Sequence, residues 1–328
     1  MRSRLPSATV FASLIASMLA LVLALAGCSG GGATTTASAT GPARPVVAKD
    51  ANGTAITIPA VQPTRIISLA ATDSEILSAI GAAAQVIGVD AYTDYPAGMV
   101  TKTKYTDSNG IPNVEQIINA RPDLVLSFGG ETRNWDQQLL QAKVKVVSLP
   151  LGNIDGSLND ILLVGQLTHQ YPGAATLVNQ MRTRITAVRD KVKNASKVSV
   201  YMEVDDSTPG KPYVTGGNTF GDQLIDDAGG KNIFAANSTN GGYPQVGDES
   251  IIAANPQVII LTEDPLYGGN PAKVAGRPGW SAVVAVTSHH VYQINSDLIQ
   301  RPGPRLVQGL EQLAKMLHPE IFGQAPAS

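Results

Sequence analysis

Two stretches of this chain repeat one pattern, and they constrain the fold more than any other feature of the sequence. Residues 115–126 read EQIINARPDLVL, and residues 249–260, at a constant offset of 134 positions, read ESIIAANPQVII. Each copy predicts a short helix that begins at an acid and ends before a proline, followed by an apolar strand of a parallel sheet. The chain is therefore expected to fold as two related α/β lobes.

A single long helix is predicted between the two copies, over residues 172–194. Pro172 suits a first helical position, and apolar residues recur at three- and four-residue spacing along one face. The residues of that stripe are Ala174, Leu177, Val178, Met181, Ile185, Val188 and Val192. An ordinary surface helix would show the same stripe. Its place between two copies of one pattern instead favours a backbone helix of about 30 Å joining two Rossmann-like lobes, with a ligand cleft between them.

Residues 1–28 have the composition of a secretory signal peptide. Arg2 and Arg4 precede an apolar run over residues 10–26. Leu25-Ala26-Gly27-Cys28 then resembles the lipobox of a bacterial lipoprotein, and Cys28 is the only cysteine of the chain. An uncleaved membrane anchor is the alternative. Lipidation of Cys28 would leave the mature protein without a thiol for a disulfide.

The remainder divides by composition and pattern. Residues 29–45, rich in Gly, Thr, Ser and Ala, predict a flexible tether. The expected order is then an N-terminal lobe at 46–156, linking helices at 157–194 that include the backbone helix 172–194, and a C-terminal lobe at 195–328. The formal net charge of −2, without a basic stripe, argues against a nucleic-acid partner.

The first long helix of the N-terminal lobe is predicted over residues 73–80, ending at Gly81. Thr72 and Glu75 have the spacing of a capping box, in which the Glu75 side chain satisfies the start of the helix. Glu75 is therefore expected to have a local structural role.

Aromatic residues follow the predicted strands. Tyr92 lies just beyond a strand at 86–89, and Phe128 follows a strand at 124–127. Open α/β sheets carry their ligand loops at these carboxyl ends. Half-buried packing is nevertheless a common fate of tyrosine, so at this point both roles remain open for Tyr92.

Several short motifs together resemble the substrate-binding proteins of ABC importers that are built on one rigid helix, and within them the cobalamin binders. The matching stretches lie at 92–96, 113–115, 229–234 and 243–246, together with Ser296, Asp297 and Arg301, and the resemblance covers residues 60–320. It implies that the ligand contacts are Tyr92, Phe128, Tyr213, Tyr243, Asp297 and Arg301. Two positions depart from the family: Tyr243 and Asn109 stand where tryptophan is familiar.

The chemistry of these residues suits a corrinoid. A large flat ligand rimmed by amides needs aromatic walls and a few hydrogen-bonding groups. Asp297 and Arg301 are four residues apart and would share a helix face, although an exposed ion pair of little consequence has the same spacing.

Haem on the same scaffold is the nearest alternative. Its propionates favour Arg or Lys, and its iron favours a Tyr or His ligand. The loops instead carry Asp94, Glu131 and Asp297 against Lys211 and Arg301, which leans away from haem. A ferric siderophore stays possible, because aromatic and arginine contacts would serve it too.

Glu115 and Glu249 open the two matching helices. An acid there is stabilised by the helix dipole, which is sufficient reason for its presence. In the family that the chain resembles, the equivalent pair docks onto arginines of the permease, and the matched placement favours that role here.

Other classes of function find little support in the sequence. There is no Gly-x-Ser-x-Gly elbow and no His-Glu-x-x-His helix, so no enzyme is predicted. The four histidines lie outside the proposed cleft loops, which argues against a resident metal. We therefore expect a monomeric, lipid-anchored extracytoplasmic receptor without a cofactor, whose partners are a corrinoid, the transmembrane subunits of an ABC permease and the membrane.

Overall fold

Each copy of the repeated pattern lies in a sheet of its own in the computed structural model, which describes residues 49–129, 134–150, 152–265 and 268–323. The expectations for the signal peptide at 1–28, for lipidation of Cys28, for the tether at 29–45 and for Glu131 lie outside the described residues. No helix within the described ranges is both long and apolar enough to cross a bilayer.

The N-terminal lobe holds a parallel five-stranded sheet with the order β3-β2-β1-β4-β5. From β1 the chain adds β2 and β3 on one side of the sheet, and it then returns to add β4 and β5 on the other side. This is the doubly wound arrangement. The elements are β1 (Ile66–Ser68), α1 (Ala71–Ala79), η1 (Ala83–Gln85), β2 (Val86–Val89), α2 (Ala97–Val100), β3 (Thr103–Lys104), α3 (Val114–Asn119), β4 (Leu124–Phe128), α4 (Asn134–Gln141) and β5 (Val146–Leu149).

The C-terminal lobe holds the second sheet, with the order β10-β9-β6-β7 and with β8 also paired to β6. Only β7 runs antiparallel to its neighbour among the described pairs. The elements are β6 (Val198–Asp205), β7 (Tyr213–Val214), α7 (Phe220–Asp227), β8 (Gly230–Asn232), α8 (Thr239–Gly242), α9 (Asp248–Ala254), β9 (Val258–Leu261), α10 (Pro271–Val274), η2 (Trp280–Ala282), α11 (Val284–Thr287) and β10 (Val291–Gln293).

The repeat extends to the backbone conformation. Arg121, after α3, and Asn255, after α9, have φ angles of 48° and 47°, and each precedes a proline. A residue before proline is disfavoured in the right-handed helical region, so both helices end with one left-handed residue. The expected two-lobed α/β fold is confirmed.

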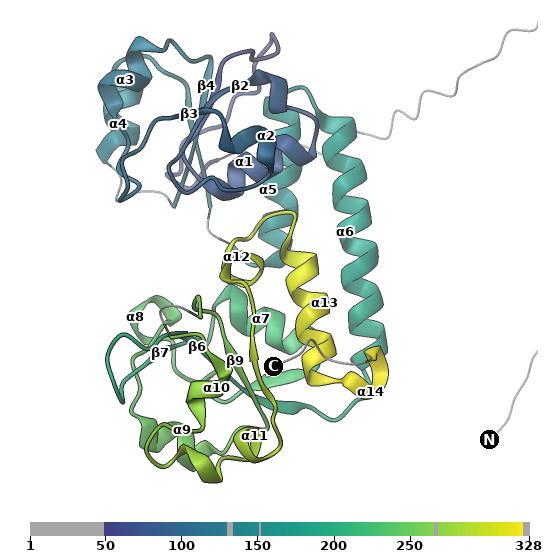
Figure 1. The fold of residues 1–328 in the computed structure, drawn as a ribbon. Coiled ribbons are helices and arrows are strands. Elements are labelled where there is room, and N and C mark those ends of the chain that lie inside the picture. The colour runs from purple at the N-terminus through teal and green to yellow at the C-terminus, as the bar shows by residue number, and fades with distance from the viewer. Residues whose placement is uncertain (1–48, 130–133, 151, 266–267, 324–328) are drawn as a thin grey trace, which may run out of the picture. The chain divides into compact units, whose positions relative to one another are not determined.

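Two helices join the lobes, α5 (Ile154–Leu167) and the long α6 (Tyr171–Val192). Compared with the expectation, α5 begins within the segment assigned to the N-terminal lobe, and α6 starts one residue earlier and ends two residues earlier. After β10 the chain returns through α12 (Ser296–Gln300), α13 (Leu306–Leu317) and α14 (Pro319–Phe322), and α13 packs along α6 (Figure 1).

The apolar stripe of α6 is part of a continuous core. Every residue predicted for it is buried except Leu177, which is partly buried against the same cluster. That cluster also contains Ile66 and Leu124 from the first sheet and Val200 and Ile260 from the second. The packed helix thus shares one core with both sheets.

The capping box predicted for α1 does not form. The helix begins at Ala71 after Ala70, which caps it without a side-chain hydrogen bond, and Glu75 lies inside the helix. The Glu75 carboxylate pairs instead with an arginine that follows it by 230 residues. A tertiary partner therefore replaces the local one.

Candidate functional site

A first cavity, of about 460 Å³, lies at the carboxyl ends of four strands of the N-terminal lobe. Leu69 follows β1, Tyr92 follows β2, Phe128 ends β4 and Leu149 ends β5, and all four line it. The edge includes the switch between β1 and β4, where the strand order reverses and open α/β sheets bind ligands. The fold of this lobe thus places the cavity where a ligand site is expected.

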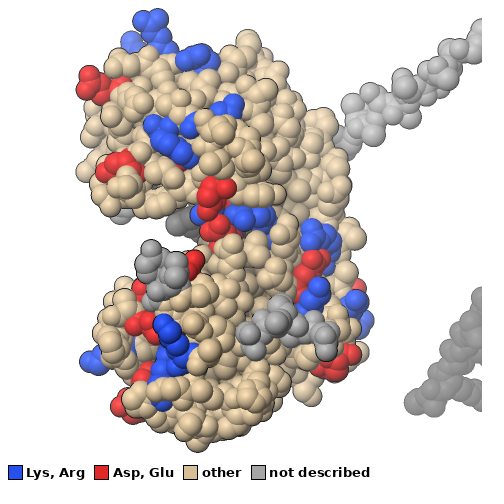
Figure 2. All heavy atoms as spheres, viewed as in Figure 1, with Lys and Arg blue, Asp and Glu red and all other residues tan. Residues whose placement is uncertain are grey.

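A second cavity, of about 760 Å³, extends the first toward the C-terminal lobe. It is lined by Asn153 at the start of α5, by Phe220 and Gln223 of α7, and by Tyr243 after α8. Gln300 and Pro302 line both cavities. Figure 2 shows the surface hollowed between the lobes, and we call the two cavities together the interlobe groove.

Three of the four predicted aromatic contacts line this groove. Tyr92 is 53% exposed, its ring lies against Gly110, and its hydroxyl donates a hydrogen bond to the carbonyl oxygen of Ser108. Phe128 borders the first cavity and Tyr243 the second. Tyr213 is half-buried in β7 and lines neither cavity. The groove therefore has aromatic side chains on both lobes.

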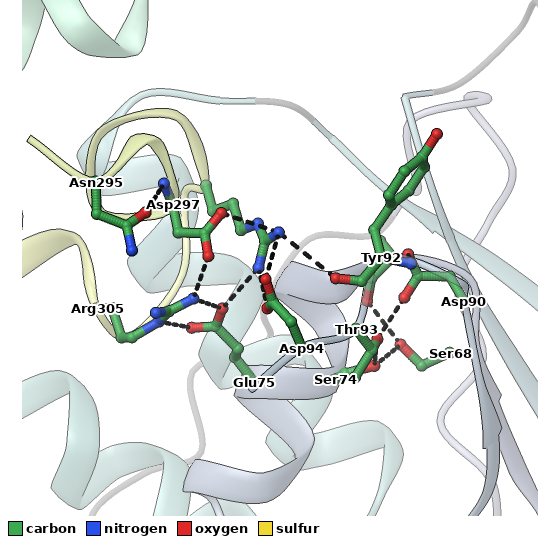
Figure 3. Close-up of polar contacts among 12 residues, drawn as sticks. Ser68, Ser74, Glu75, Asp90, Tyr92, Thr93, Asp94, Asn295, Asp297 and Arg305 are labelled. Atoms are coloured by element: carbon green, nitrogen blue, oxygen red, sulfur yellow. Dashed lines mark hydrogen bonds and ion pairs between the residues drawn. The ribbon is translucent and has the colours of Figure 1, made fainter. Parts of the chain in front are cut away.

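Arg301 and Arg305 anchor an ion-pair network between the lobes (Figure 3). The guanidinium of Arg305 donates two hydrogen bonds to the carboxylate of Glu75 in α1, at 2.6 and 2.9 Å, and lies 3.2 Å from Asp297. It also lies 4.4 Å from the centre of the Tyr95 ring. This network fixes the segment around α12 against the N-terminal lobe.

Arg301 lines the first cavity, but its guanidinium already has carboxylate partners. It lies 2.7 Å from Asp94 and 2.9 Å from Asp297, with Glu75 at 3.7 Å. Arg301 follows the last residue of α12 and has an extended backbone, so the two residues do not share a helix face as predicted. Their ion pair is nevertheless not an exposed one, since Arg301 and Asp297 are 21% and 16% exposed. Asp297 itself lines neither cavity. It orients both arginines rather than facing the groove.

Three aspartates that sequence reasoning did not select as site residues also line the first cavity. They are Asp73 in the first turn of α1, Asp90 after β2 and Asp160 in the middle of α5, and we call them the carboxyl floor. All three are buried. One pattern could have revealed Asp160: an acid among the regularly spaced apolar positions of a core-facing helix.

Burial raises the pKa values of two acids of the carboxyl floor, Asp73 and Asp160. Burial, and then the negative charges of Asp160 and Asp90, raise the pKa of Asp73 well above the usual carboxyl range. Burial also raises the pKa of Asp160 to about 7. Asp90 has partners, because its carboxylate accepts from the backbone N–H of Tyr92 and from the hydroxyl of Thr93. The floor thus combines two acids of raised pKa with a third, Asp90, that is held by hydrogen bonds.

The loop that carries Tyr92 is held by a chain of hydroxyl groups (Figure 3). Thr93 contacts Ser74 at 2.9 Å, and Ser74 donates to Ser68 at 2.9 Å. Lys104 donates to the carbonyl oxygen of Thr93. Such satisfied buried contacts pre-organise the wall of the first cavity.

Glu115 and Glu249 are both exposed in the first turns of their helices, α3 and α9. In Figure 1 both helices lie on the side of their lobes that faces away from α6. The structure thus leaves both carboxylates accessible to a partner.

Known proteins are similar to this chain in sequence, and solved structures are similar to it in fold. Residues 66–298 match the family described as periplasmic binding protein. An ABC transporter substrate-binding lipoprotein of Bacillus subtilis, YvrC, is 32% identical over 285 residues, 85% of this chain and 87% of that protein. A cobalamin-binding protein of Halobacterium salinarum is 29% identical over 282 residues, 84% of this chain and 74% of that protein. The crystal structure of a possible iron-binding (periplasmic solute-binding) protein of Staphylococcus epidermidis has a TM-score of 0.68 at 29% identity, covering 79% of this chain and 100% of that chain.

Proposed function

Because this chain belongs to the periplasmic binding protein family, we propose that it captures cobalamin or a related corrinoid outside the cytoplasmic membrane and delivers it to an ABC permease. The family match confirms the expectation of a solute-binding protein that is not an enzyme. The finer proposal rests on the interlobe groove, which aromatic side chains of both lobes line and whose first cavity contains three buried acids.

That groove suits a flat ligand with a neutral, amide-bearing rim. Tyr92 and Phe128 on one lobe and Tyr243 on the other offer ring faces to a macrocycle. Each cavity by itself has a volume usual for a small-molecule site, and the two share residues, which suits a ligand larger than either. A relative named as a cobalamin-binding protein supports the same ligand class.

Haem is the second candidate, and the charges of the first cavity disfavour it. Two propionates would need cationic partners. Arg301, the one cationic residue among the described lining residues of the first cavity, is held by Asp94 and Asp297. The carboxyl floor would repel a propionate wherever it is ionised. A ferric siderophore stays an alternative for the same aromatic walls.

Titration calorimetry with cyanocobalamin, haemin and a ferric siderophore tests the ligand. We expect cyanocobalamin to bind with Kd below about 1 μM, which corresponds to roughly −8 kcal/mol, and haemin to bind at least 100-fold more weakly. Tyr92→Ala should weaken cyanocobalamin binding about tenfold by removing one ring wall. Tighter binding of haemin or of the siderophore would overturn the corrinoid proposal.

We also propose that Glu115 and Glu249 dock onto the permease. Glu115→Lys combined with Glu249→Lys should reduce transport by the assembled importer about tenfold or more, since reversed charges repel a cationic partner, while ligand affinity stays unchanged. Asp190→Lys, at an exposed site on α6, is the matched control and should transport normally. Equal transport by the double variant and the control would exclude this docking mode.

The anchor and the motion complete the proposal. Lipidation of Cys28 would tether the receptor to the outer face of the membrane and leave the lobes free to meet the permease. The shared core along α6 limits lobe motion to a small rocking, and we expect the receptor to act as a monomer.

A further inference from the structure

The carboxyl floor carries an inference about which part of the ligand enters the first cavity. Asp73 and Asp160 come from helices that pack on one another, α1 and α5, and both line the same cavity as Tyr92 and Phe128. The walls thus suit the flat face of a ligand, and the acids lie where its polar rim would reach.

One atom of the floor has no partner. The Oδ2 atom of Asp73 is buried and makes no hydrogen bond within the described residues. A buried polar atom left unpaired costs roughly 1–3 kcal/mol, and most such atoms in proteins are satisfied. Because Asp73 also lines the first cavity, we take its unpaired oxygen as the candidate position for a ligand group.

The protonation state of Asp73 and Asp160 determines which ligand group can hydrogen-bond with them. Burial raises the pKa of Asp160 to about 7 and that of Asp73 well above the usual range. A protonated carboxyl group offers one O–H donor and one carbonyl acceptor. A primary amide offers the reverse pair, N–H and C=O, at matching spacing. A ligand carboxylate offers acceptors and negative charge only.

We propose that Asp73 and Asp160 form a subsite that binds a peripheral primary amide of the ligand, with a protonated carboxyl donating to the amide oxygen and accepting from its N–H. This subsite rests on the proposed corrinoid function and adds a rule to it: the receptor distinguishes an amide from the corresponding carboxylate at one position of the rim.

Two other charged side chains border these acids, and both have partners of their own. Asp90 faces Asp73 but is held by Tyr92 and Thr93, and Arg301 at the rim is held by its own carboxylates. The long helix α6, which packs against α5, contributes buried apolar side chains: Ala174, Val178 and Met181. Affinity for a neutral amide should therefore follow the protonation of the subsite.

The test compares cyanocobalamin with its monocarboxylic acid isomers, in each of which one propionamide is a propionate. For the wild type we expect a nearly constant affinity for cyanocobalamin below about pH 6.5, falling by up to about tenfold per pH unit above pH 7 as one proton is lost. At pH 8 at least one isomer should bind about tenfold or more weakly than cyanocobalamin, and the gap should narrow at pH 6.

Variants separate a ligand contact from a structural role. Asp160→Asn and Asp73→Asn each keep a donor and an acceptor, so each should keep affinity at pH 6 within about tenfold. Asp160→Asn removes the acid whose pKa is about 7 and should flatten the pH profile, whereas Asp73→Asn leaves that acid in place and should keep a fall in affinity at high pH. Asp190→Asn, on the exposed face of α6, should keep the wild-type profile. Circular dichroism checks that every variant is folded.

The outcomes distinguish the two proposals. If the wild type binds cyanocobalamin with a flat pH profile and binds all isomers equally, the amide subsite is wrong and the corrinoid function stands. If the wild type binds haemin and not cyanocobalamin, both proposals fail together.

Discussion

Replacing Arg305 with alanine is expected to lower the free energy of unfolding by about 3–5 kcal/mol, because it leaves a buried carboxylate without its main partner. Glu75 is 2% exposed and receives both arms of the Arg305 fork. Its other cationic neighbour, Arg301, lies farther away at 3.7 Å and is shared with two aspartates. Urea denaturation of the wild type and of Arg305→Ala measures the loss.

Arg184→Ala is the matched control. Arg184 makes the same bidentate contact with Glu311, but those side chains are 45% and 37% exposed. Exposed pairs contribute about 0–1 kcal/mol, so this variant should remain close to the wild type. Glu75→Leu combined with Arg305→Leu should recover most of the loss, because both buried charges are then absent. A loss for Arg305→Ala no larger than for Arg184→Ala would contradict the argument.

Asp160→Asn is expected to stabilise the protein, and to do so only when the pH is high. The pKa of Asp160 is raised to about 7 in the folded state, whereas the pKa of an aspartate in an unfolded chain is about 3.9. Between these values the folded state binds more protons than the unfolded state, so the stability of the wild type falls as the pH rises. The asparagine variant does not ionise and escapes this loss.

The difference between variant and wild type should be small near pH 4, grow up to about pH 7 and stay constant above it. Each pKa unit between the unfolded and the folded value corresponds to about 1.4 kcal/mol, so the largest expected stability difference between the variant and the wild type is roughly 4 kcal/mol. Urea denaturation at pH 4, 6 and 8 measures the profile, and Asp190→Asn should show no such dependence. A pH-independent difference for Asp160→Asn would mean that Asp160 is not a protonated acid in the folded receptor. A side chain that lowers stability and lines the ligand cavity is a functional candidate on physical grounds.

Periodic features were predictable from the sequence. The buried stripe of α6 and the strands β2 and β9 lie where their apolar spacing placed them, because that spacing reports directly which face of a local element meets the core. The offset repeat likewise predicted two sheets, and aromatic residues after strand ends predicted Tyr92 and Phe128 near one groove. Tyr243, which the family resemblance predicted, also lines that groove.

Partnerships between distant residues were decided only by the tertiary structure. Glu75 has the spacing of a local helix cap, yet its partner lies 230 residues away. Arg301 was expected to face the ligand, and it borders the cavity while two aspartates hold its guanidinium. Asp73 has no distinguishing pattern along the chain, and Asp160 is marked only by its place among apolar residues; both line one cavity because α1 packs on α5. The periodicity of a helix or strand depends only on residues that are close together in the sequence. Burial, ion pairing and protonation instead depend on which elements the folded chain brings together.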